Sequence, residues 1–83
     1  MQLVFLGKFG ELAPKGLASP TLPDDVRTLA DLKDWIAGQA PVLGKAMALT
    51  TTRVAVNQAL VHDLSRPVRA GDEIAFLPPM SGG

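Results

Sequence analysis

Residues 71–83 read GDEIAFLPPMSGG, and this stretch decides how the fold ends. Gly71-Asp72-Glu73 is typical of a turn, and the apolar run Ile74–Leu77 after it predicts a strand that is buried on both faces. Pro78-Pro79 would end that strand, because proline has no N–H to donate to a sheet ladder and its φ is fixed. The stretch therefore predicts a final, central strand that stops abruptly at a stiff, extended segment.

Four residues follow the prolines, namely Met80, Ser81, Gly82 and Gly83. Glycine has no Cβ, so Gly82-Gly83 makes the thinnest terminus that a polypeptide can have. Such a terminus could enter a channel that excludes other residues and present its carboxylate to a reactant. A frayed end that happens to finish in glycine is the alternative. We favour the functional interpretation because a buried strand and a double proline come directly before the glycines.

The composition predicts one small folded domain. The chain has 83 residues, of which 47% are hydrophobic, and its eight basic residues balance eight acidic ones. Without a basic excess, binding to nucleic acid as a main role is not favoured. The absence of cysteine excludes disulfides, thiolate metal sites and a cysteine nucleophile, and it is compatible with the cytoplasm. No apolar run is long enough to span a membrane and no signal peptide is visible, so we expect a cytoplasmic protein.

The clearest helix is predicted over Thr28–Gln39. Thr28 suits the N-cap, with Asp31 three residues later in the arrangement of a capping box. Leu29, Leu32 and Ile36 share one face of this helix, which would pack on the core. The other predicted elements are a strand at Leu3–Leu6, a helical turn at Lys8–Ala13, a weak edge strand at Leu17–Leu22, a strand at Thr51–Val56, a short strand at Ala59–Val61 and the last strand at Ile74–Leu77.

Pro41–Leu49 is ambiguous and could form a second helix. Because the first and last strands are the most apolar, we expect them to pair side by side at the centre of the sheet. The Thr28–Gln39 helix would then lie across one face. This order of elements predicts an α+β roll in which a sheet packs on one main helix.

No residue constellation predicts catalysis or metal binding within the chain itself. His62 is the only histidine, and although Asp63 follows it, no recognisable nucleophile motif accompanies the pair. The acidic residues match no metal-ligand spacing, and we interpret them as turn residues and helix-start charges. We therefore expect no metal site and no bound cofactor.

Alternation along the strands predicts an apolar patch on the sheet face away from the helix. Leu6, Leu60 and Leu77 would form this patch and serve as a partner interface, together with Pro78 and Pro79. The alternative is that Pro41–Leu49 folds over this face and covers it.

Two segments carry a specific resemblance, namely residues 54–61 (VAVNQALV) and residues 71–83. They resemble the small subunit of molybdopterin synthase, a family of ubiquitin-like sulfur carriers. The turn, the double proline and the terminal Gly-Gly are together specific for that family. The resemblance implies a ubiquitin-like β-grasp fold with a mixed sheet over residues 1–79 and a flexible tail over residues 80–83.

The resemblance also implies a function. In this family an E1-like partner adenylates the terminal glycine with ATP, and sulfur from a donor then replaces AMP, which here would leave a thiocarboxylate on Gly83. Met80, Ser81 and Gly82 would thread into the large subunit of the synthase, in a heterotetramer, where sulfur is transferred to the cyclic pyranopterin precursor of the molybdenum cofactor. The small subunit would thus be a sulfur donor and not an enzyme on its own.

Two alternatives remain open at the level of sequence. One is a sulfur carrier of the same fold for tRNA thiolation or thiamine synthesis. The other is a ubiquitin-like modifier that is conjugated to lysines through Gly83. The chemical nature of the acceptor distinguishes these functions.

Overall fold

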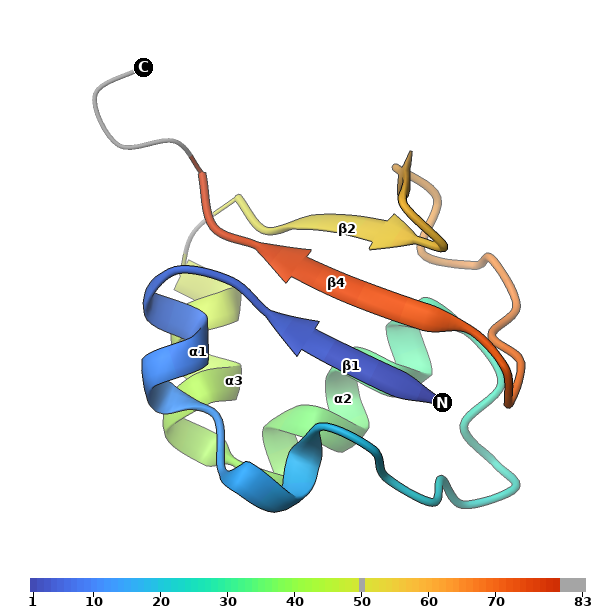
Figure 1. Ribbon diagram of the computed structural model, residues 1–83, viewed down its shortest axis with the longest axis horizontal. Coiled ribbons are helices and arrows are strands. Elements are labelled where there is room, and N and C mark those ends of the chain that lie inside the picture. The colour runs from blue at the N-terminus through green and yellow to red at the C-terminus, as the bar shows by residue number, and fades with distance from the viewer. Residues whose placement is uncertain (50, 80–83) are drawn as a thin grey trace.

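The computed structural model describes residues 1–49 and 51–79, which form one mixed sheet with helices against it (Figure 1). The strand order is β1-β4-β2-β3, with β1 parallel to β4 and the other neighbours antiparallel. Among the helices of these two ranges, none combines the length and hydropathy needed to cross a bilayer. The strands are β1 (Gln2–Phe5), β2 (Arg53–Val56), β3 (Ala59–Val61) and β4 (Glu73–Leu77).

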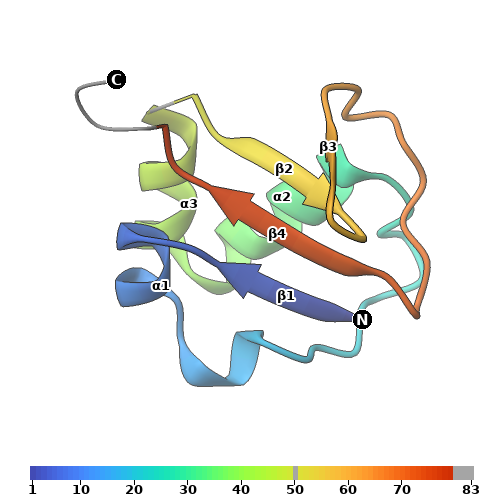
Figure 2. The same cartoon turned by 45° about the horizontal axis from the view of Figure 1, so that its top comes forward.

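The helices lie on one side of the sheet. In both views α2 and α3 are behind the strands, and α1 lies beside the end of β1 (Figures 1 and 2). Ordinary packing explains the arrangement, because a sheet can bury one apolar face only by covering it with another layer. The helical elements are α1 (Lys8–Leu12), the short 3-10 helix η1 (Lys15–Leu17), α2 (Leu29–Gln39) and α3 (Pro41–Leu49).

The start of α2 confirms the predicted capping box. The backbone N–H of Asp31 donates to the Thr28 hydroxyl at 3.2 Å, and the Asp31 carboxylate accepts from the Thr28 backbone N–H at 3.1 Å. A further backbone hydrogen bond comes from Arg27, and these backbone donors hold the pKa of Asp31 below its usual value. Leu29, Leu32 and Ile36 are fully buried, as their spacing predicts.

The core side of the sheet consists of in-register rows of apolar side chains. In one row, Phe5 pairs with Phe76 and Phe76 pairs with Val54 across the ladder. The Phe5 and Phe76 rings stack with their centroids 5.4 Å apart and 13° between their planes. This face and the helices bury one contiguous cluster, whose members are Leu3, Phe9, Leu17, Leu29, Leu32, Ile36, Ala40, Leu43, Met47, Val54, Val56, Ile74 and Phe76.

Three predictions about the fold need correction or completion. First, β1 and β4 do pair side by side, but β1 is at the edge of the sheet and the inner strands are β4 and β2. Second, Leu17–Leu22 is not a strand. Pro20 has no backbone N–H to donate to a ladder, and the chain after η1 is irregular. One backbone hydrogen bond joins this segment to the edge of β1, from Leu3 N to Ala18 O at 2.8 Å.

Third, the ambiguous segment Pro41–Leu49 is a helix, α3. Leu43 and Met47 are four residues apart on one helical face, and both are buried against the core cluster. Since α3 packs with α2 behind the sheet, it does not cover the opposite face, and the alternative in which it did so is wrong (Figure 2).

A polar cluster joins the β2–β3 turn to the start of β4. Asn57 and Gln58 form this turn with positive φ values of 50° and 72°, the conformation that matches the twist of a two-residue hairpin. The Asn57 side-chain amide donates to an Asp72 oxygen at 3.0 Å, and its oxygen accepts from Glu73 N at 3.0 Å. The other Asp72 oxygen accepts from Arg69 N at 2.9 Å. These bonds lower the pKa of Asp72, first through Asn57 and then through the Arg69 backbone.

We predict that Asp72→Ala lowers the free energy of unfolding by about 1 kcal/mol at neutral pH, because it removes two hydrogen bonds to a charged but partly solvated group. The folded pKa of Asp72 lies below the ordinary value of 3.8. Its contribution is therefore present above that value and is lost as the pH falls through the lower, folded pKa. Urea unfolding of both proteins between pH 7 and pH 2 measures the difference.

Asp25→Ala is the matched control, since Asp25 is an exposed aspartate outside this polar cluster. An Asp72→Ala deficit that stays constant down to the lowest pH would show that the carboxylate charge has no part in it.

Candidate functional site

The candidate site lies where β4 ends, because the sequence places the tail that is predicted to be reactive after that strand. Leu77 is the last residue of β4 and pairs with Arg53 of β2. On the other side, Leu6 N donates to Phe76 O at 3.1 Å, which extends the contact with β1 beyond its last residue. Pro78 is half-buried and Pro79 is exposed. The chain therefore leaves the sheet at a fixed point, flanked by the β1–α1 corner and the start of β2.

Gly7 shapes one side of this exit. It caps the N-terminus of α1 with φ 55° and ψ −136°, a combination that residues with a side chain rarely adopt. An ideal Cβ at Gly7 would lie 3.1 Å from Cγ of Pro78, which is tighter than most Cβ contacts and would require Pro78 to shift by a few tenths of an ångström. The bare Cα of Gly7 thus permits the tight turn into α1 and the close approach of Pro78. Sequence reasoning missed this role, since nothing local to Gly7 indicates that Pro78 packs on it.

The outer face of the sheet carries an apolar row in register across all four strands. Val4 pairs with Ala75, Ala75 with Ala55, and Ala55 with Leu60. Paired residues of neighbouring strands point to the same face, so these four side chains lie in one line. No helix within residues 1–49 and 51–79 covers this side of the sheet in either view (Figures 1 and 2).

Of the predicted patch residues, Leu60 ends this row, and Leu6 and Leu77 lie beside it, two residues beyond Val4 and Ala75. Leu60 is 54% exposed and Leu6 is 41% exposed, and Leu77 is half-buried beside them at the end of β4. We call the surface formed by Val4, Leu6, Ala55, Leu60, Ala75 and Leu77 the docking face. Its alanines are half-buried and small, so the centre is flat and the leucines stand at its borders.

The pair His62 and Asp63, also considered from the sequence, shows no hydrogen bond between its two side chains among the described residues. His62 is exposed, and the adjacent Asp63 carboxylate accepts from Ser65 Oγ at 2.6 Å and from Ser65 N at 2.9 Å. These Ser65 hydrogen bonds, the hydroxyl first, hold the pKa of Asp63 below its usual value. Within residues 1–49 and 51–79, no group of three His, Cys, Asp or Glu side chains is placed to hold a metal ion. The predicted threading residues Met80, Ser81 and Gly82, and the reactive Gly83, lie outside the described residues.

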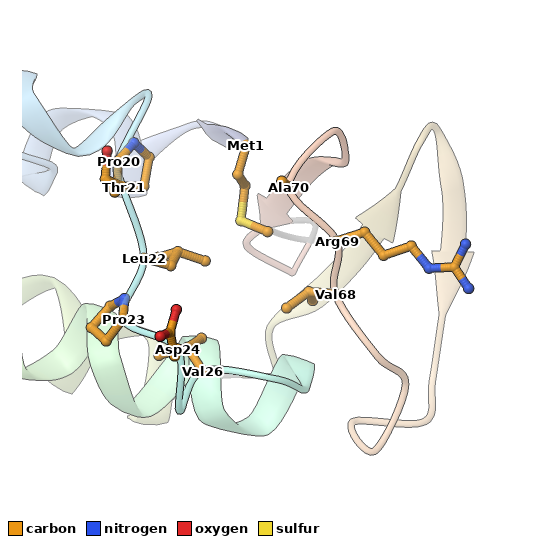
Figure 3. Close-up of a pocket in the computed structure, with 10 residues that line it drawn as sticks. All are labelled: Met1, Pro20, Thr21, Leu22, Pro23, Asp24, Val26, Val68, Arg69 and Ala70. Carbon is orange, nitrogen blue, oxygen red and sulfur yellow. The ribbon is translucent and has the colours of Figure 1, made fainter.

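A hollow of about 430 Å³ lies at the other end of the sheet (Figure 3). Its lining includes Met1 before β1 and Ala70 before β4, whereas the tail leaves from the far end of β4. The lining is mainly apolar, with Asp24 and Arg69 as its charged members. Because the five-residue length of β4 separates it from the tail, this hollow does not belong to the candidate site.

Comparison with known proteins places this geometry in a family. Residues 3–83 match the ThiS family. The chain belongs to the ThiS family. Over all 83 residues it is 32% identical to the molybdopterin synthase sulfur carrier subunit of Haemophilus influenzae and 31% identical to that of Escherichia coli, and in each case 99% of the relative is covered. The resemblance to ubiquitin-like sulfur carriers predicted from the tail is thereby confirmed.

The predicted fold class is also confirmed. The crystal structure of SAMP1 from Haloferax volcanii matches 98% of this ThiS-family chain and 96% of its own chain, with a TM-score of 0.73 at 24% sequence identity. The α+β roll described above is therefore a ubiquitin-like β-grasp, with a mixed sheet packed on α2 as its main helix.

For the exit corner, we predict that Gly7→Ala lowers the free energy of unfolding by about 1–3 kcal/mol, because alanine is strained at this φ and ψ and its methyl group meets Pro78. Thermal unfolding followed by circular dichroism measures the loss. Gly16→Ala is the control, since a Cβ at Gly16 meets no atom within 4 Å.

The double variant Gly7→Ala/Pro78→Ala separates the two causes. If the Pro78 contact matters, the double variant is more stable than the sum of the single effects predicts. Strict additivity would mean that backbone strain alone accounts for the loss and that Gly7 does not support the exit of the tail.

Proposed function

We propose that this chain is the sulfur carrier subunit of a molybdopterin synthase, with Gly83 as the residue that carries sulfur. The observation that carries the proposal is the sequence identity of 31–32% over all 83 residues to two proteins of that name, each of which is covered to 99%. The docking face at the base of the tail supports it, because a carrier must bind the protein that uses its terminus. No catalytic constellation is evident among the described residues, so the partner would supply the acid–base groups.

The chemistry follows from the properties of a carboxylate. The terminal carboxyl has an ordinary pKa near 3.5, so it is ionised and a poor electrophile at neutral pH. In the proposed cycle, an E1-like enzyme transfers AMP from ATP to one oxygen of the Gly83 carboxylate and releases pyrophosphate. A sulfide equivalent from a sulfur donor then attacks the carbonyl carbon and displaces AMP. The resulting thiocarboxylate is a soft, ionised nucleophile whose sulfur attacks the cyclic pyranopterin precursor. Water then cleaves the bond between the Gly83 carbonyl carbon and the sulfur, which leaves the sulfur on the precursor and regenerates the Gly83 carboxylate.

The docking face would bring the terminus to the active site of the partner. Pro79 to Gly83 spans at most about 17 Å when fully extended, so the body must dock close to the reacting atoms. Leu6, Leu60 and Leu77 border the apolar row beside the exit, where Pro78 and Pro79 start the tail. We propose that this surface binds the large subunit and that the two form a heterotetramer in the cytoplasm. We propose that the E1-like enzyme binds the same surface.

The carrier step is tested by intact mass. Incubation with an E1-like activating enzyme, ATP and sulfide is expected to raise the mass by the difference between one sulfur and one oxygen atom. A chain that lacks Gly83 is the control and should keep its mass. An unchanged mass of the full chain, with an activator that thiolates its own carrier, would contradict the proposal.

The acceptor identifies the pathway. The thiocarboxylate form, mixed with the large subunit and the pyranopterin precursor, is expected to yield molybdopterin. Sulfur transfer to a tRNA base or a thiazole precursor instead, or an isopeptide bond to lysine, would assign one of the alternative functions.

For the docking face, we predict that Leu60→Glu weakens binding to the large subunit at least about thirtyfold, since hot-spot side chains of an interface contribute about 2 kcal/mol or more and the variant would bury a charge against the partner. Calorimetry measures the affinity, and circular dichroism checks that the variant is folded. Val42→Glu is the control, because Val42 is 69% exposed on α3, behind the sheet. Equal affinities of the Leu60→Glu variant and the wild type would mean that the partner binds elsewhere.

A further inference from the structure

A basic hollow of about 420 Å³ lies beside the docking face, on the β2–β3 side. Its three basic side chains come from different elements, namely Lys33 from α2, Arg53 from β2 and His62 from the segment after β3. No aspartate or glutamate is among the residues that line it. The remaining lining residues are Thr51, Thr52, Val54, Leu60, Val61 and Leu64.

The charges of Lys33 and Arg53 in this hollow are not neutralised by described parts of the chain. Among residues 1–49 and 51–79, the side chains of Lys33, Arg53 and His62 form no ion pair and no hydrogen bond with another side chain. Two acidic residues are adjacent to these side chains in sequence. Asp63, next to His62, is engaged by the hydroxyl and the backbone N–H of Ser65, and Asp34, next to Lys33, lines a different hollow. Since the whole chain has no net charge, this hollow is a local positive region on a neutral protein.

The hollow is continuous with the docking face. Leu60 lines it and also stands at the end of the apolar row, opposite Ala55. Arg53 pairs with Leu77, the residue from which the tail leaves the sheet. If a protein binds the docking face, the hollow therefore lies at the rim of that interface. The rim of a protein interface is typically polar and surrounds an apolar centre.

We propose that this hollow receives an acidic segment of the protein that binds the docking face, with Asp or Glu carboxylates paired to Arg53 and Lys33. The inference rests on the proposed docking function, because it assigns the segment to that same partner. Arginine suits this role since its planar guanidinium binds a carboxylate through two parallel hydrogen bonds. Charged groups at the rim of an interface mainly raise the association rate and make binding depend on salt.

The double variant Lys33→Glu/Arg53→Glu tests the proposal. Its affinity for the large subunit is expected to fall about tenfold at low ionic strength, mostly through a slower association rate, and less at high salt. Wild-type affinity should itself weaken as salt is added, and the variant should show a flatter dependence. Surface plasmon resonance at several salt concentrations gives the rates and the slope together.

Two controls make the outcome specific. Lys15→Glu/Lys45→Glu makes the same charge change at exposed residues of η1 and α3 and should leave the association rate unchanged. Arg53→Lys keeps the charge and should retain most of the salt dependence. If the charge-reversal variant does not fold, Lys33→Gln/Arg53→Gln replaces it, with a smaller loss expected.

The two proposals fail in different ways. If the wild type does not bind the large subunit, the proposed function is wrong. If the wild type binds and the charge-reversal variant binds with the same affinity, rate and salt slope, only the acidic partner segment is ruled out. Shifts of the Arg53 and His62 NMR signals on addition of inorganic phosphate, with docking unaffected by the variant, would instead assign the hollow to a small anion and overturn the proposal.

Discussion

The pairing of the last strand with the first is the contact on which the rest of the structure depends. β4 lies inside the sheet, parallel to β1 and antiparallel to β2, so its ladder groups are used on both sides. The stacked rings of Phe5 and Phe76 fix this pairing from the core side. Because an inner strand has little freedom to shift, Leu77 delivers the tail to one defined point of the sheet. A tail that followed a frayed edge strand would start from a point that varies relative to the sheet.

The two faces of the sheet have different tasks, and the size of the chain explains why. All helices that the structure describes are needed to cover the core face, where every buried side chain of the cluster is apolar. A domain of 83 residues has little chain left for a third layer. The outer face therefore keeps its apolar row open, and the small side chains of Ala55 and Ala75 make it flat enough for another protein to approach.

Polar interactions in this molecule organise turns and helix ends. The Asp72 carboxylate ties the β2–β3 turn to the start of β4, and the Asp31 carboxylate begins α2. Both carboxyl groups have lowered pKa values because they accept hydrogen bonds, which stabilises their charged forms. This structural use of the carboxylates agrees with the proposed function, in which the carrier presents its terminus and the partner supplies the catalytic groups.

Local patterns in the sequence were sufficient for most elements. The capping box at Thr28, the apolar run before Pro78 and the turn before Glu73 each depend on a few adjacent residues, and the structure contains all three. The same tail motif identified the family. The proposed interface residues Leu6, Leu60 and Leu77 came from strand alternation, which also needs only local information.

Tertiary structure alone decided the features that join distant residues. The edge position of β1, the irregular path after Leu17 and the helical state of Pro41–Leu49 depend on which surfaces pack together, and similar local patterns are compatible with other outcomes. The contact of Gly7 with Pro78 spans almost the whole chain. The basic hollow likewise exists only because the fold brings α2, β2 and the end of β3 together. A sequence pattern reports neighbours along the chain, whereas register and packing decide which residues become neighbours in space.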